Sequence, residues 1–231
     1  MRPITFQFPT ITQREICATQ TTTATDQALI INGSLSNFGL NNTQGYVAQA
    51  VCPGVQRPVM IFSTGNISTS TFTISGFDCR ASGLLTTTII GPTGTATTQQ
   101  TVTEFNRVTA ISVGTIASSN LTIGFGPSGT TNWVKGDIFA NPFNMTISVT
   151  VSTGTPITIQ DTPDDLNIVA PGVARVFNHT TLATVTVSAQ SNYAMPVNFT
   201  RAILTASQGS ASTTLATSTP IVTFIQTSAG A

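Results

Sequence analysis

Charged side chains are scarce in this chain. Only 7% of its 231 residues are Asp, Glu, Lys or Arg, and eight acids balance eight bases. An average soluble protein has about 25% charged residues. The bases are dispersed, so no nucleic-acid footprint is present. A lone monomer of this kind has little electrostatic protection against association. The composition therefore favours a component of an assembly whose neighbours cover its surface, with a glycan-solubilised secreted protein as the alternative.

Long apolar runs and closely spaced cysteines are also missing. No run approaches the roughly 20 residues that a membrane-spanning helix needs, and the N-terminus has no apolar core of a signal peptide. Cys17, Cys52 and Cys79 are too few and too widely spaced for a disulfide framework or a CxxC metal motif. We expect buried thiols in a protein that folds in a reducing cytoplasm, without a membrane partner.

Residues for catalysis are sparse as well. His179 is the only histidine, and no GxSxG or phosphate-binding glycine motif accompanies it. Asp161, Asp164 and Asp165 form the only carboxylate cluster, which suits turn formation, a structural cation or, least well, a glycosidase pair. The sequence therefore predicts a protein without enzymatic activity, cofactor or metal, with His179 hydrogen-bonded at the entrance to a strand.

Short alternating segments fill the rest of the chain. Threonine and other β-branched residues are frequent, and Gly, Pro and Asn turns separate the segments. No segment keeps a helical period for three turns. The pattern predicts an all-β fold, with strands at residues 28–31, 59–62, 71–74, 84–90, 101–105, 108–113, 121–125, 145–151, 157–160, 185–189, 198–205 and 221–226, and loops at 161–172 and 207–220.

The prediction of two domains rests on residues 121–151. An alternating strand ends at Gly126-Pro127-Ser128-Gly129, and a segment with the only tryptophan, Trp133, precedes the next strand. We expect two β-sandwich or jelly-roll-like domains, at 21–127 and 128–231, with Trp133 at an interface between them.

Residues 1–20 are expected to form an extended N-terminal arm. Ile4, Phe6 and Phe8 alternate between Pro3 and Pro9, which suits an edge segment better than a central strand. Such an arm must lie on its own domain or on a neighbouring subunit, so Ile4, Phe6 and Phe8 are further candidate interface residues.

Two stretches resemble virion proteins of tailed bacteriophages. Residues 57–126 resemble a segment with a TFTI-containing hairpin, a strand that ends in a Gly-Pro turn, and a closing strand, here EFNRVTAISV. QSNYAMPVNFTRAILTAS and VTFIQ, at 190–207 and 222–226, resemble the C-terminal end of the same proteins, and TNWVKGDIFANPFNMTISVTV fits that pattern. The arm at 1–20 and the loop at 161–172 depart from it.

The resemblance implies a non-enzymatic structural protein of the virion. It suggests a head decoration, or cement, protein on the outer surface of the phage head, made in the cytoplasm of the bacterial host. Its expected partners are the major capsid protein and copies of itself, with a trimer favoured. A tail or neck component and a carbohydrate-binding module of a tail protein are the alternatives.

Overall fold

The computed structural model of the chain describes residues 3–8, 11, 13–37, 47–48, 54–79, 83–115, 117, 119–151, 156–205 and 219–226. Every regular element among them is a β-strand, and all the pairings between strands described below are antiparallel. These residues hold no helix that could span a membrane. The all-β prediction is thus confirmed, and it rested on the frequency of β-branched residues in short alternating runs.

Contacts divide the chain into two compact units. The N-terminal unit consists of Thr10–Gly129 and Ser207–Thr217, and the C-terminal unit of Met1–Pro9, Thr130–Ala206 and Ser218–Ala231. The expected arm at 1–20 is therefore divided, because residues 1–9 belong to the C-terminal unit and residues 10–20 to the N-terminal unit. The units differ from the expected domains at 21–127 and 128–231 also because Ser207–Thr217 belongs to the N-terminal unit.

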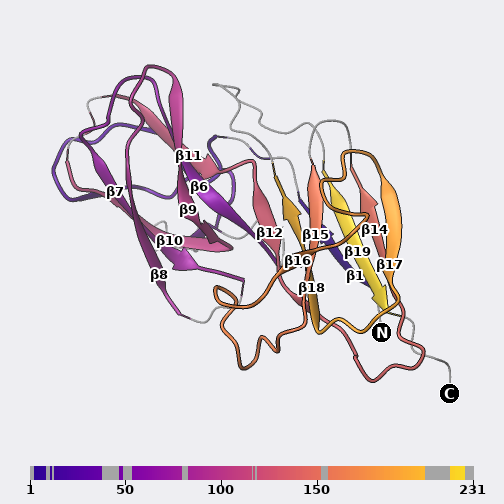
Figure 1. Ribbon diagram of the computed structural model, residues 1–231. Helices are drawn as coiled ribbons and strands as arrows, with labels where there is room; N and C mark the ends of the chain where they lie inside the picture. The colour runs from indigo at the N-terminus through magenta and orange to yellow at the C-terminus, as the bar shows by residue number, and fades with distance from the viewer. Residues whose placement is uncertain are drawn as a thin grey trace. The chain divides into compact units, whose positions relative to one another are not determined.

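Two sets of paired strands build the N-terminal unit (Figure 1). In the first, β6 lies between β9 and β11, and β2 pairs with β11. In the second, β10 pairs with β3, β5 and β7, while β4 pairs with β5 and β8 with β7. The strands are β2 (Cys17–Gln20), β3 (Gln27–Ala28), β4 (Ser36–Asn37), β5 (Val47–Ala48), β6 (Val55–Ser63), β7 (Thr71–Phe77), β8 (Leu85–Ile90), β9 (Thr97–Phe105), β10 (Arg107–Val113) and β11 (Leu121–Phe125).

One hydrophobic core fills the N-terminal unit. In β7 every second residue is buried, which is the period of a strand with one face on the core. By contrast, all five residues of β11 are buried. Both sets of strands contribute to the core, whose largest members include Ile61, Phe72, Ile74, Phe105, Ile123 and Phe125.

Close backbone contact explains the glycines of the Gly126–Gly129 turn. A Cβ atom on Gly126 would lie 2.7 Å from Cγ of Pro58, and one on Gly129 would lie 2.6 Å from the Gln56 carbonyl oxygen. The Gly126 amide donates to the Pro58 carbonyl oxygen at 2.7 Å. Glycine is needed here because the turn lies directly against β6. The turn leads into β12 (Gly129–Thr131), so the break in the sequence pattern is short.

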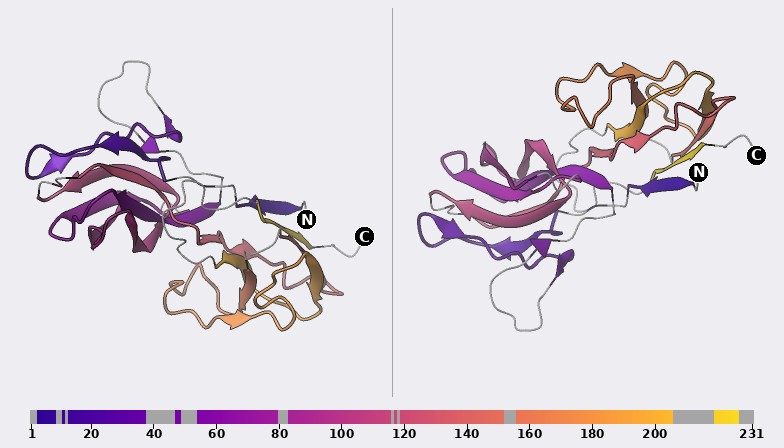
Figure 2. Two further views of the ribbon diagram at one scale, coloured as in Figure 1. Left: turned by 90° about the horizontal axis from the view of Figure 1, so that it is seen from above. Right: turned by 90° about the horizontal axis from the view of Figure 1, so that it is seen from below.

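The C-terminal unit joins both ends of the chain in one sheet. Its strand order is β1-β19-β14-β17, and both views in Figure 2 show β1 alongside β19. In a second set, β15 and β13 pair with β18, and β16 pairs with β15. The strands are β1 (Ile4–Gln7), β13 (Val134–Lys135), β14 (Met145–Thr150), β15 (Ile157–Thr162), β16 (Phe177–Asn178), β17 (Ala189–Tyr193), β18 (Phe199–Leu204) and β19 (Ile221–Gln226).

One predicted strand of this unit is wrong. Residues 185–189 alternate in sequence, yet only Val185 is bridged to Ile157, and the strand begins at Ala189. The pairing of β17 with Met145–Val149 of β14 fixes its position. Most side chains from 185 to 189 are exposed, so no buried face holds a strand there. Of the loop predicted at 207–220, residues 207–218 lie outside the described residues.

The described thiols are free. Cys17 is buried and Cys79 is half-buried. Burial raises the pKa of Cys17 to about 12, and burial is also the main cause that raises the pKa of Cys79 to about 12. Both groups therefore carry their protons at neutral pH and are poor nucleophiles. Cys52 lies outside the described residues.

Candidate functional site

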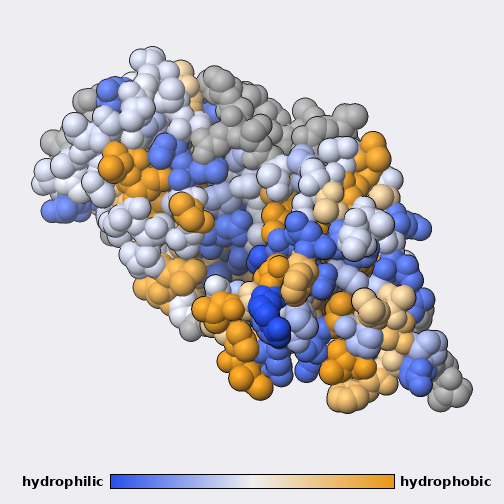
Figure 3. Space-filling model, viewed as in Figure 1, coloured by the Kyte–Doolittle hydropathy of each residue, from blue (hydrophilic) through white to orange (hydrophobic). Residues whose placement is uncertain are grey.

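Exposed apolar side chains are most numerous in the C-terminal unit. Figure 3 shows hydrophobic surface over the loop between β15 and β16, among other places. Single exposed apolar residues are ordinary, but a concentration of them marks a contact surface. We call this set the exposed apolar set: Ile138, Phe139, Ile168, Val173, Phe177, Val187 and Met195.

The loop between β15 and β16 holds two members of this set in a fixed conformation. Asp164 closes the loop by accepting from the Arg175 backbone amide at 2.7 Å and from Nε and Nη2 of the guanidinium at 3.1 and 2.5 Å. These hydrogen bonds are the main cause that lowers the pKa of Asp164 below its usual value. Leu166 anchors the loop in the interior, whereas Ile168 and Val173 are 84% and 76% exposed.

The three clustered carboxylates have different partners. Asp164 pairs with Arg175, Asp165 accepts from the Asn167 backbone and side-chain amides, and Asp161 accepts from the Tyr193 hydroxyl at 3.0 Å. Within the described ranges, no three His, Cys, Asp or Glu side chains come together in a way that could hold a metal ion. The first two carboxylates have the local roles that favour Asp in turns.

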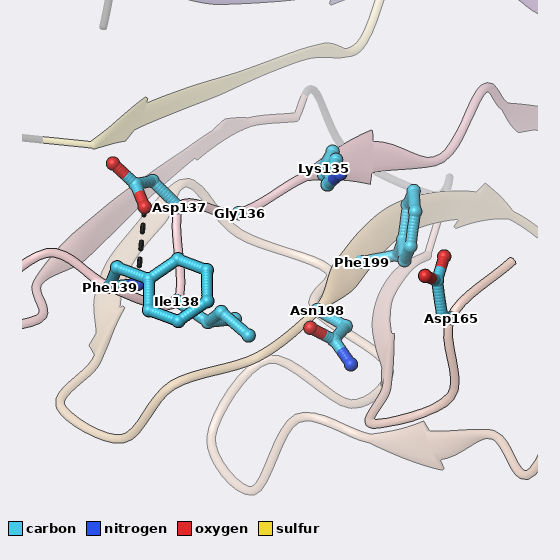
Figure 4. A pocket seen from close by; sticks show the side chains of 8 residues that line it. All are labelled: Lys135, Gly136, Asp137, Ile138, Phe139, Asp165, Asn198 and Phe199. Atoms are coloured by element: carbon cyan, nitrogen blue, oxygen red, sulfur yellow. Dashed lines mark hydrogen bonds between the residues drawn. The ribbon is translucent and has the colours of Figure 1, made fainter. Parts of the chain in front are cut away.

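One pocket of about 480 Å³ lies beside β13 and β18. Figure 4 shows Ile138 and Phe139 beside it, with Asn198 and Phe199 of the β18 region across from them. The Asp137 carboxylate accepts from the Phe139 amide at 3.1 Å, which fixes the turn that exposes the phenyl ring. The lining is mixed, since Ile138, Phe139 and Phe199 are apolar whereas Lys135, Asp137, Asp165 and Asn198 are polar or charged.

A second pocket, of about 560 Å³, combines apolar and polar side chains. We call it the His179–Tyr193 pocket. Its lining comes from the ends of β15, β16 and β17 and from the segment that follows β17: Asp161, Pro163, Phe177, Asn178, His179, Thr180, Asn192, Tyr193, Ala194, Met195, Pro196 and Val197.

His179 is held rigidly at one side of this pocket. It is 5% exposed, and its backbone amide donates to the Ile159 carbonyl oxygen. Its Nδ1 accepts from the amides of Thr181 and Leu182 at 3.2 and 3.3 Å, and its ring meets that of Tyr193 edge to face, with centroids 4.7 Å apart. Because Nδ1 is an acceptor, the neutral ring carries its proton on Nε2.

Asp161 and Tyr193 form a pair next to that ring. Burial is the main cause that raises the pKa of Asp161 above its usual value, and burial likewise raises the pKa of Tyr193. The sequence prediction placed His179 as a hydrogen-bonded residue near a strand, but it did not place Asp161 and Tyr193 beside it. The sequence gives little sign of this grouping, because Asp161, His179 and Tyr193 are brought together only by the tertiary pairing of separate strands.

The predicted interface residues lie in the C-terminal unit. Ile4 is half-buried, Phe6 and Phe8 are buried, and Phe6 packs edge to face on Phe224. Trp133 is half-buried, with the Arg201 guanidinium 4.4 Å from the centre of its ring. Phe6 thus packs on its own unit, whereas the roles of Ile4, Phe8 and Trp133 at an interface stay predictions.

No protein-family model matches this chain, and a search of curated proteins finds no match.

Proposed function

We propose that this chain is a non-enzymatic structural protein of a tailed-bacteriophage virion, specifically a decoration protein of the head. The observation that carries the proposal is the exposed apolar set on a chain with very few charges. The resemblance of residues 57–126, 190–207 and 222–226 to phage virion proteins supports the same class. Two compact all-β units suit this role, because the loops between their strands can present contact residues.

The resemblance to virion proteins makes the major capsid protein the proposed partner of this surface. Ile168 and Val173 project from a loop that the Asp164–Arg175 pair holds closed. Such a loop loses little conformational entropy when it binds. A protein that binds the assembled lattice and not the separate subunits stabilises the lattice by mass action, and many weak contacts add their effect over a head.

Capsid binding tests the proposal directly. Heads of the parent phage that lack this protein are mixed with the purified chain and sedimented. We expect the wild type to sediment with the heads and I168D/V173D to remain in solution. V102D is the matched control, because Val102 is an equally apolar, fully exposed residue of the N-terminal unit. Absence of binding by the folded wild type would overturn the proposal.

Copy number distinguishes the head from the tail. Quantitative mass spectrometry of purified particles should find this chain in numbers comparable to the major capsid protein. A few copies per particle would instead support the tail or neck alternative.

A further inference from the structure

The His179–Tyr193 pocket shares Phe177 and Met195 with the exposed apolar set and places them beside polar side chains. Its volume of about 560 Å³ lies within the roughly 300–1,000 Å³ of small-molecule sites. Such sites are lined mostly by apolar groups, with a few polar groups that fix the orientation of the ligand. Phe177, Tyr193, Met195 and Pro196 supply the apolar part here.

Two polar atoms at this pocket have no partner in the described part of the chain. One is Nε2 of His179, whose ring is almost completely buried and whose Nδ1 makes all the hydrogen bonds of the imidazole. The other is Oδ2 of Asp161, since the Tyr193 hydroxyl donates to Oδ1. Neither atom is closed off from solvent. A ligand that replaces water at both atoms gains from their fixed positions, because little conformational freedom is lost on binding.

The two atoms differ in hydrogen-bonding character. In the neutral ring, Nε2 is a donor, whereas the Asp161 carboxylate is an acceptor. A simple cation would be attracted by the Asp161 carboxylate but repelled by the imidazole N–H. A simple anion would accept from the N–H but be repelled by the carboxylate. A neutral ligand with neighbouring hydroxyl groups satisfies both, because each hydroxyl both donates and accepts. The Asn178 amide adds a donor, since its Oδ1 already accepts from Gln160 at 3.0 Å.

An aromatic ring completes the site. Phe177 is 55% exposed and directly precedes the polar residues Asn178 and His179. The C–H face of a pyranose packs on such a ring, while its hydroxyl edge makes the hydrogen bonds. The lining includes one carboxylate, Asp161, whereas glycoside hydrolysis ordinarily requires two. The chemistry of the lining thus suits binding of a sugar without cleavage.

We propose that the His179–Tyr193 pocket binds a neutral saccharide unit, with its ring on Phe177 and its hydroxyls on His179 and Asp161. This role goes beyond attachment to the capsid and does not depend on it. A virion protein with such a site would bring the particle into contact with polysaccharide.

The single histidine gives a specific measurement. The C–H signals of the His179 ring are followed by NMR during titration with the methyl glycosides of glucose, galactose, mannose and N-acetylglucosamine. We expect at least one glycoside to shift these signals with millimolar saturation. F177A should weaken binding of that glycoside about tenfold, as loss of one aromatic contact does. F139A is the matched control, because Phe139 is an exposed ring at the other pocket, and it should leave the affinity unchanged.

Three results would overturn the proposal. The first is no shift of the His179 signals with any of the four glycosides. The second is equal affinity in the wild type and F177A. The third is a response to N-acetylglycine N-methylamide but to none of the glycosides, which would assign the pocket to a peptide. Because F177A alters an exposed side chain, its fold can be verified from the unchanged remainder of the spectrum.

Discussion

The two units of this chain treat their polar and apolar side chains in opposite ways. The N-terminal unit encloses a charged residue, Arg57, which is only 2% exposed, beside a large apolar core. The C-terminal unit keeps the Asp164–Arg175 ion pair at the surface and holds most of the exposed large apolar side chains among the described residues. The comparison separates a unit that encloses a cation from one that has more exposed large apolar side chains.

Arg57 is the cation that the N-terminal unit encloses. Its Nη1 donates to the carbonyl oxygens of Gly126 and Pro127 at 3.0 and 3.2 Å, so the guanidinium holds the turn that follows β11. Desolvation lowers the pKa of Arg57 to about 10, against the opposing effect of Glu15 and Glu104. The side chain therefore remains a cation at neutral pH, and the two acids compensate it.

Removal of the Arg57 guanidinium should lower the stability of the protein more than any other substitution in this Discussion. R57A removes a buried cation that Glu15 and Glu104 stabilise, together with its two hydrogen bonds to the carbonyl oxygens of Gly126 and Pro127. Loss of one partner of a buried pair costs about 3–5 kcal/mol. We expect urea denaturation to show a loss of this size, with hydrogen exchange accelerated first in β6 and β11.

The control for this prediction is R107A. Arg107 is exposed, with its guanidinium 4.5 Å from the centre of the Phe77 ring. An exposed contact of that kind contributes about 0.5–1 kcal/mol. Equal losses of unfolding free energy in R57A and R107A would show that the contribution of Arg57 to stability does not depend on its burial.

The contact between Arg201 and Trp133 in the C-terminal unit should make an intermediate contribution to stability. Arg201 lies over the indole and also donates to Gln160 Oε1 from Nε and Nη2, at 3.1 and 2.9 Å. R201A should cost about 1–2 kcal/mol, given the usual strength of such contacts. Because Trp133 is the only tryptophan, its emission should shift to the red as the ring becomes more exposed.

R201K is the informative companion variant. Lysine keeps the positive charge but lacks the planar fork that stacks on the ring and bonds to Gln160. We therefore expect R201K to resemble R201A in stability. Wild-type emission and stability in R201A would show that Trp133 is held by other contacts.

Strands with a strict two-residue period were the most predictable part of the fold. β7 and β14 alternate because one face of each packs on a core, and that period is visible in the sequence. The same rule failed at 185–189, where Val185 is buried but Thr186, Val187 and Ser188 face solvent. Sequence alternation shows that a strand is possible, but only a paired neighbour and a buried face determine whether it forms.

The His179–Tyr193 pocket could not be derived in this way. Asp161, His179 and Tyr193 are spread over 32 residues between the first and the last, and the Tyr193–Asp161 hydrogen bond depends on the packing of different strands. Phe177 was equally hard to assign, because an exposed ring on a two-residue strand leaves no periodic signal. The role of Arg57 was missed for the same reason, since its partners Gly126 and Pro127 are far away in the sequence.

The smallest predicted effect concerns the surface pair Asp164–Arg175. The Asp164 side chain is 12% exposed and that of Arg175 is 71% exposed, so solvent screens their attraction. In the folded state, hydrogen bonds from Arg175 lower the pKa of Asp164 from its usual 3.8. The stabilisation is thus fully present above that value and is lost as the pH falls through the lower, folded-state pKa.

D164N should reduce the melting temperature slightly at neutral pH and not at all in strong acid. The D164N/R175Q double variant should be no less stable than D164N, because either change already removes the pair. A difference between wild type and D164N that stays constant from neutral to strongly acidic pH would contradict a role for the charged pair in closing the loop.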